Sequence, residues 1–170
     1  MPFDTDTLAS RFRRLAPAVD YCALRVVEEQ SETASVRQDV AAPVRSAIDR
    51  GAMVTVIDGD GIGYAATSDL SDTGLAWAIA RAHEWARLSQ GRSVFAGARP
   101  ELPALPPGSR YASPTLRPIA WSKADRLEVL MRESTACRID PRIVDWEASL
   151  WTVRAQQLTV DAGGGEAFQQ

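Results

Sequence analysis

Apolar residues recur at helical spacing in three stretches of the chain, each predicting a helix. Residues Thr7 to Ala16 carry apolar positions on one side and arginines on the other, and Pro17 marks the end. Ser71 is a good N-cap for a second helix, whose apolar stripe comprises Leu75, Ala78, Ile79, Ala82 and Ala86. Ser122 and Asp125 resemble a capping box that starts a third helix, with the inner stripe Ala124, Leu127, Leu130, Met131, Ser134 and Cys137.

Alternating apolar and polar residues predict strands between these helices. A hairpin is expected from Ala52–Ile57 and Ile62–Thr67, joined by a turn rich in aspartate and glycine. The other predicted strands are Tyr21–Glu28, the weaker Ser35–Val40 and Val44–Ile48, and Val144–Leu150, followed by a turn near Thr152–Arg154 and a return over Gln157–Asp161. The pattern favours an α+β fold with a mixed or antiparallel sheet packed against two main helices.

The stretch from Ser93 to Pro118 has six prolines and no periodicity, so a Pro-rich crossing loop is expected there. We expect residues 1–18 to form a helical segment and residues 19–170 to form one domain. Because the chain ends soon after a strand that leads onward, we expect a fragment of a longer protein.

Composition excludes several classes of function. The formal net charge is -3 and the hydrophobic content is 45%, as in ordinary soluble proteins. No basic cluster predicts direct binding to nucleic acid, and no apolar run is long enough to span a membrane, so a cytoplasmic protein is expected. Cys22 and Cys137 fall on core-facing positions and are expected to be reduced, buried thiols.

The glycine-rich segment Asp58-Gly59-Asp60-Gly61-Ile62-Gly63 is the first candidate for chemistry. A loop that cradles phosphate opens a helix, whereas this one leads into a strand and carries two aspartates that repel phosphate. A calcium loop would need a terminal glutamate at the twelfth position. Asp58, Gly59, Asp60, Gly61 and Gly63 are therefore interpreted as a structural turn.

The remaining candidates also lack the groups that their chemistry needs. His83 is the single histidine, so the two-histidine helix of a zinc protease is missing, and it lacks an orienting partner. Either cysteine would need a nearby base to act as a nucleophile. The carboxylate pairs, Glu28 with Glu29 and Asp145 with Glu147, are interpreted as solvated strand positions, and the five tryptophans as core and interface residues. No catalytic, cofactor-binding or metal residue is predicted in this chain.

Trp77 and Leu88 lie nearly opposite the apolar stripe of the second helix. A helix on a sheet needs one apolar face, so this second patch indicates an interface. The helix after Ser122, the Pro-rich loop and another polypeptide all remain open as the partner.

The order of these elements resembles the N-terminal domain of the TldD/PmbA family, known as modulators of DNA gyrase and as metal-dependent proteases. The resemblance covers about residues 19–165. It rests on the sequence RGAMVTVI at 50–57, the turn, GIGYAATSDL at 61–70 and the alanine-rich helix. The positions that fit the family pattern are Gly51, Gly61, Gly63, Tyr64, Ala65, Thr67, Leu70 and Ala82.

The family's zinc-binding HExxxH helix lies in a C-terminal domain, and none of its residues can be carried over to this chain. The resemblance therefore implies a non-catalytic N-terminal domain, inactive alone, that helps to form the protease chamber, the subunit interface and the surface for peptide access. Zinc is expected in the absent C-terminal domain or in a partner subunit. The implied partners are a TldD/PmbA-type subunit, in a homodimer or heterodimer, and a peptide or unfolded-protein substrate. The alternatives are a stand-alone α+β binding module and a catalytically inactive PmbA-like subunit.

Overall fold

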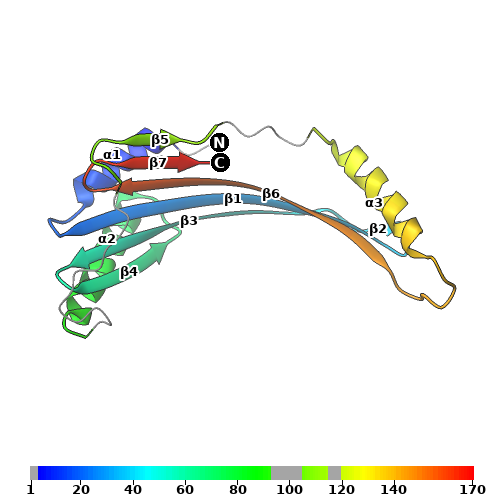
Figure 1. The fold of residues 1–170 in the computed structure, drawn as a ribbon, viewed down its shortest axis with the longest axis horizontal. Helices are drawn as coiled ribbons and strands as arrows, with labels where there is room; N and C mark the ends of the chain where they lie inside the picture. The colour runs from blue at the N-terminus through cyan, green and yellow to red at the C-terminus, as the bar shows by residue number, and fades with distance from the viewer. Residues whose placement is uncertain (1–3, 93–104, 115–119) are drawn as a thin grey trace. The chain divides into compact units, whose positions relative to one another are not determined.

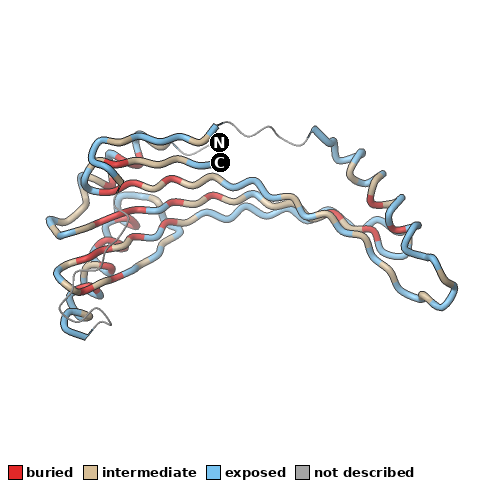
Figure 2. Tube along the Cα trace, in the orientation of Figure 1, coloured by how far each residue is buried: buried red, intermediate tan, exposed pale blue. Residues whose placement is uncertain are grey.

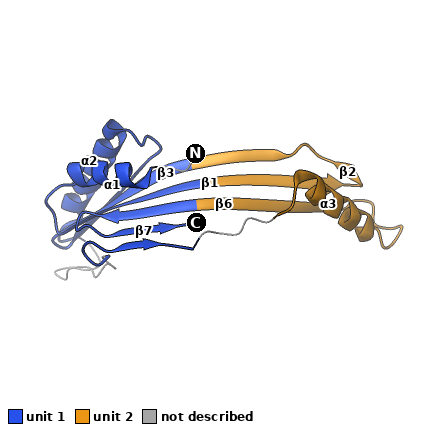
Figure 3. Cartoon of the chain, turned by 90° about the horizontal axis from the view of Figure 1, so that it is seen from above, with its two compact units in different colours: residues 1–28, 50–114, 156–170 blue, residues 29–49, 115–155 orange. Residues whose placement is uncertain are grey.

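The computed structural model describes residues 4–92, 105–114 and 120–170 of the chain (Figure 1). They fall into two compact units, each made from separated stretches of sequence (Figure 3). Unit 1 comprises residues 1–28, 50–114 and 156–170, and unit 2 comprises residues 29–49 and 115–155. The residues that are not described lie within these ranges.

The described residues form three helices and seven strands, which confirms the expected α+β class. The sheet has the order β4-β3-β1-β6-β7-β5, with β2 beside β1. It is mixed, because β5 runs parallel to β7 while the β3–β4 and β6–β7 pairs are antiparallel. In chain order the elements are α1 (Thr5–Leu15), β1 (Tyr21–Arg37), β2 (Val40–Ala41), β3 (Arg45–Asp58), β4 (Gly61–Thr67), α2 (Asp72–Ser89), β5 (Arg110–Ala112), α3 (Lys123–Cys137), β6 (Glu147–Asp161) and β7 (Glu166–Gln169).

Three strands are longer than the sequence pattern predicts. β1 joins the predicted strand at 21–28 to the start of the one at 35–40, and β3 joins those at 44–48 and 52–57. The turn expected near Thr152–Arg154 is wrong, because β6 runs straight through it. Residues 45–50 are all exposed, so pairing of the backbone continues there without the burial that produces an alternating pattern.

In unit 1, α1 and α2 share one hydrophobic core with the sheet (Figure 2). The predicted stripe of α2 is confirmed, since Leu75, Ala78, Ile79, Ala82 and Ala86 are all buried. These side chains pack with Phe12 of α1 and with inward-facing strand residues: Cys22, Leu24, Val26, Val54, Val56, Leu158 and Val160. The removal of this apolar surface from water is the main stabilising term for the unit.

Unit 2 has a smaller core, in which α3 packs on Ala34 and Val36 through Leu130. The capping box of Ser122 and Asp125 is confirmed. The stripe predicted for α3 is wrong at Ala124, Leu127 and Cys137, which are exposed. Instead, the buried Ser134 hydroxyl donates to the Asp39 carboxylate at 3.0 Å, so a polar contact replaces apolar packing there.

The Pro-rich stretch lies partly outside the described residues, namely at 93–104 and 115–119, and its expected course as a crossing loop remains a prediction. Its described part contains β5, a strand that the sequence pattern missed. All three residues of β5 are exposed, so no alternation of buried and exposed positions marks this strand in the sequence.

Candidate functional site: the glycine hairpin and helix α2

The turn between β3 and β4 is hydrogen-bonded to two neighbouring segments of the chain. Asp58 pairs with Gly61 across the hairpin, and Gly59 has a positive φ of 61°. The Gly59 N–H donates to Asp20 at 2.8 Å, and the Gly91 N–H donates to the Asp60 carboxylate at 3.1 Å. These contacts tie the turn to residues before β1 and after α2, which is a structural use of its polar groups.

Gly61 and Gly63 have a second role that the turn interpretation missed. A Cβ atom at Gly61 would lie 2.0 Å from the Ala86 carbonyl oxygen, and one at Gly63 would lie 1.9 Å from that of Ala82. The backbone of α2 therefore rests directly on the backbone of β4. Two glycines spaced for one strand face, together with two alanines spaced for one helix face, are the sequence signal for this contact.

Ser89, the last residue of α2, also contacts the backbone of β4. Its hydroxyl oxygen accepts from the Ile62 N–H at 2.9 Å and lies 3.0 Å from the carbonyl oxygens of Ile62 and Ala86. Because β4 is the last strand on its side of the sheet within the described residues, this side chain satisfies backbone groups that have no partner strand there.

His83 has an orienting partner that the sequence analysis did not foresee. Its Nε2 atom lies 3.4 Å from Asp58 Oδ2, and both side chains are about one-third exposed, at 32% and 35%. Within the described residues, no group of three histidine, cysteine, aspartate or glutamate side chains is arranged to hold a metal. The contact links α2 to the hairpin at its surface.

The two cysteines differ, which corrects the expectation that both are buried. Cys22 is buried in the unit 1 core, where desolvation raises the pKa of its thiol to about 12. Cys137 is exposed at the end of α3. A thiolate at Cys22 is therefore negligible near neutral pH.

This difference predicts the outcome of thiol labelling. We expect a maleimide or aromatic disulfide reagent to modify one thiol per native chain and two per chain in denaturant. In Cys137→Ser the native signal should vanish, while in Cys22→Ser it should remain. Rapid native labelling of Cys137→Ser would contradict the buried position of Cys22.

The carboxylate pairs do not form acid–base dyads. Glu28 and Glu29 are consecutive on β1, so their side chains point to opposite faces. Glu28 is buried and lies 3.7 Å from Arg50. Asp145 precedes β6, which corrects its predicted place within a strand, and the Arg37 guanidinium lowers the pKa of its carboxyl through hydrogen bonds.

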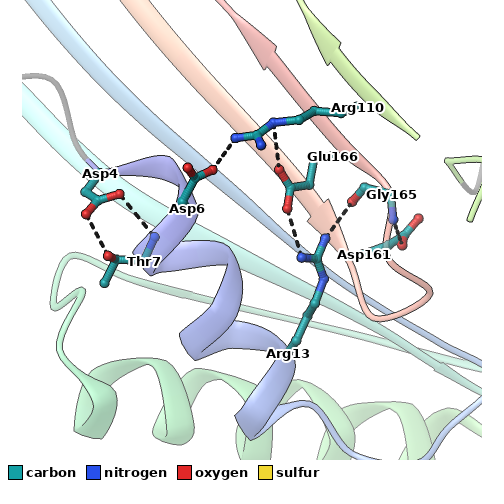
Figure 4. A network of polar contacts seen from close by, with 8 residues as sticks. All are labelled: Asp4, Asp6, Thr7, Arg13, Arg110, Asp161, Gly165 and Glu166. Carbon is teal, nitrogen blue, oxygen red and sulfur yellow. Dashed lines mark hydrogen bonds and ion pairs between the residues drawn. The ribbon is translucent and has the colours of Figure 1, made fainter. Parts of the chain in front are cut away.

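A network of acidic and basic side chains connects α1 with β5 and β7 (Figure 4). The Glu166 carboxylate lies between Arg13, at 2.8 Å, and Arg110, at 3.5 Å, and Arg110 also pairs with Asp6. Nearby, the buried Asp161 accepts from the backbone N–H groups of Gly165 at 2.8 Å and Leu105 at 3.1 Å. Acids held in this way by cations and backbone groups serve to fix elements together.

The outer face of α2 is exposed and rich in large side chains. Trp77 is 58% exposed, Trp85 47% and Leu88 52%. Arg81 lies over the Trp85 ring at 4.9 Å and pairs with Glu84 at 2.6 Å. Trp121 and Trp151 are also exposed, so none of these four tryptophans is a core residue, and their expected use at an interface remains a prediction.

The β3–β4 hairpin and α2 pack directly on each other and form one part of an α+β domain. Residues 22–86 match the family model of the PmbA/TldA metallopeptidase domain 1. This match confirms the resemblance to domain 1 of the PmbA/TldD family that was drawn from the sequence. No curated protein matches the sequence closely enough to add to this.

Solved structures share the fold over nearly the whole chain. TldE from Thermococcus kodakarensis has a TM-score of 0.67 at 15% identity, over 96% of this chain and 36% of TldE. A candidate modulator of DNA gyrase from Bacteroides thetaiotaomicron has a TM-score of 0.63 at 13% identity, over 96% of this chain and 37% of that one. A candidate modulator of a DNA gyrase from Thermotoga maritima has a TM-score of 0.60 at 10% identity, over 97% of this chain and 37% of that one. The chain thus spans about a third of the length of these proteins.

No helix in the described residues is long and apolar enough to cross a membrane.

Proposed function

We propose that this chain is the non-catalytic N-terminal domain of a TldD/PmbA-like metal-dependent peptidase. Its role is to help form the protease chamber, the subunit interface and the surface through which peptides enter. The observation that carries the proposal is the match of residues 22–86 to domain 1 of this metallopeptidase family. The sequence has one histidine, so these 170 residues cannot supply the two histidines of the family's HExxxH helix.

The exposed face of α2 supports the interface part of this role. Trp77 and Leu88 are more than half exposed on a helix whose opposite face is fully buried. Large apolar side chains that gather on a surface mark contact with another polypeptide. The partner in this proposal is a TldD/PmbA-type subunit, identical or different, and the zinc site lies in that partner or in the remaining part of a longer chain.

The purified chain should hydrolyse neither unstructured peptides nor unfolded casein, with or without added zinc. It should also contain no stoichiometric zinc by elemental analysis. Metal-dependent proteolysis that survives further purification and follows the protein peak would overturn the non-catalytic role. The same assay with a full-length TldD/PmbA-type partner tests the subunit role, where co-elution and peptide cleavage are expected together.

The gene offers an independent check. A reading frame that holds this chain and an HExxxH motif would support an N-terminal domain of the catalytic polypeptide. A reading frame without the motif would favour the inactive PmbA-like subunit or the stand-alone binding module.

A further inference from the structure

Four exposed residues on the outer face of α2 form a regular seam, which we define as Trp77, Arg81, Glu84 and Leu88. They are separated by four, three and four residues, the spacing at which one helix meets another along a coiled-coil seam. All four are exposed, while Ala78, Ala82 and Ala86 on the inner side are buried. The seam is thus available for contact in the described part of the chain.

The order of residues along the seam is complementary to itself when reversed. Reading from either end, an apolar residue comes first and a charged one second, and the two charges have opposite sign. In an antiparallel pair of identical helices, Trp77 would face Leu88 of the second copy, and Arg81 would face Glu84 of the second copy. In a parallel pair, Arg81 would face Arg81, which like-charge repulsion disfavours.

We propose that the seam pairs with the seam of a second copy of this chain, antiparallel, about a two-fold axis that crosses α2 between Ala82 and His83. The proposal deepens the interface part of the proposed function and rests on it. A two-fold axis makes both chains use the same patch, as expected for a homodimer. It also doubles every contact, so one complementary pair becomes two.

Charge complementarity is the main support for this occupant. Arg81 Nη1 lies 2.6 Å from Glu84 Oε2 within one helix, and the two side chains are 44% and 54% exposed. Antiparallel pairing brings two such pairs together, with each arginine next to two glutamates. A network of four alternating charges contributes more than an isolated surface pair. The flanking Trp85, already stacked with Arg81, shields one side of this network.

The expected dimer is reversible. One helix pair buries an area at the small end of specific interfaces, below roughly 1,200 Å² in total. We therefore expect a monomer–dimer equilibrium that depends on concentration, measured by sedimentation equilibrium on the 170-residue chain. High salt should shift it toward monomer, because the central contacts are ionic.

Charge reversal provides the decisive test. Arg81→Glu alone and Glu84→Arg alone should each lose self-association, since each places like charges across the axis. An equimolar mixture of the two variants should regain the mass of a dimer, because opposite charges then face each other between chains. Within each variant helix the pair remains broken, so an effect confined to one chain cannot produce this recovery.

Arg132→Glu, which breaks a similar exposed ion pair on α3, serves as the matched control and should leave the equilibrium unchanged. Circular dichroism should show wild-type helix content in every variant. A wild-type chain that stays monomeric at its highest soluble concentration would overturn the proposal, as would a mixture that stays monomeric. Binding of the monomer to a different TldD/PmbA-type subunit would overturn it while leaving the proposed function intact.

Discussion

Gly63→Ala should lower the free energy of unfolding by about 3–5 kcal/mol, because a buried methyl group would displace a helix backbone. The added Cβ would lie 1.9 Å from the Ala82 carbonyl oxygen and 2.4 Å from the Ala86 nitrogen. Both atoms belong to the backbone of α2, so no side-chain rotation can relieve the overlap. Urea unfolding followed by circular dichroism measures the loss.

Gly51→Ala is the matched control for this prediction. It makes the same chemical change in the neighbouring strand β3, where the new Cβ would lie 3.4 Å from the Thr67 carbonyl oxygen. That spacing is close to ordinary contact, so we expect an effect below about 1 kcal/mol. Similar losses for the two variants would show that the close approach of α2 to β4 does not determine stability.

Asp161→Ala should cost about 2–4 kcal/mol, because it leaves two backbone N–H groups without their acceptor in a buried place. The lost bonds are those from Gly165 at 2.8 Å and Leu105 at 3.1 Å. The Gly165 bond closes the turn between β6 and β7, so amide exchange should accelerate in β7 first. Thermal unfolding combined with hydrogen exchange measures both effects.

Asp145→Ala is the control for Asp161→Ala, because it removes a carboxylate that accepts no hydrogen bond in a buried place. Asp145 is exposed and its ion pair is with the exposed Arg37, so its removal should cost less than about 1 kcal/mol. Equal destabilisation by the two substitutions, or unchanged exchange in β7 of Asp161→Ala, would contradict the role given to Asp161.

Local signals were sufficient to predict helix α2. Ser71 accepts a hydrogen bond from the Gly74 N–H at 3.2 Å, as an N-cap does, and every residue of the predicted stripe is buried. Capping and the 3.6-residue period both act within one or two turns, so they are visible in the sequence. The capping box at Ser122 was predictable for the same reason.

The features that could not be predicted depend on contacts between segments far apart in the sequence. Residues 45–50 of β3 are exposed throughout, so pairing with a neighbouring strand rather than burial keeps them extended. The contact between Gly63 and Ala82 joins two elements that periodicity treats separately. The contact between His83 and Asp58 also joins two separate elements, since the hairpin places the aspartate beside α2.

The hydrogen bonds of Ser89 have a consequence for solubility. An edge strand with free N–H and C=O groups can recruit a strand from another molecule and start edge-to-edge aggregation. Occupation of both Ile62 groups by one hydroxyl removes the first pairing site after the hairpin turn. One serine at the end of a helix thus occupies an edge position that other sheets block with a proline or a bulge.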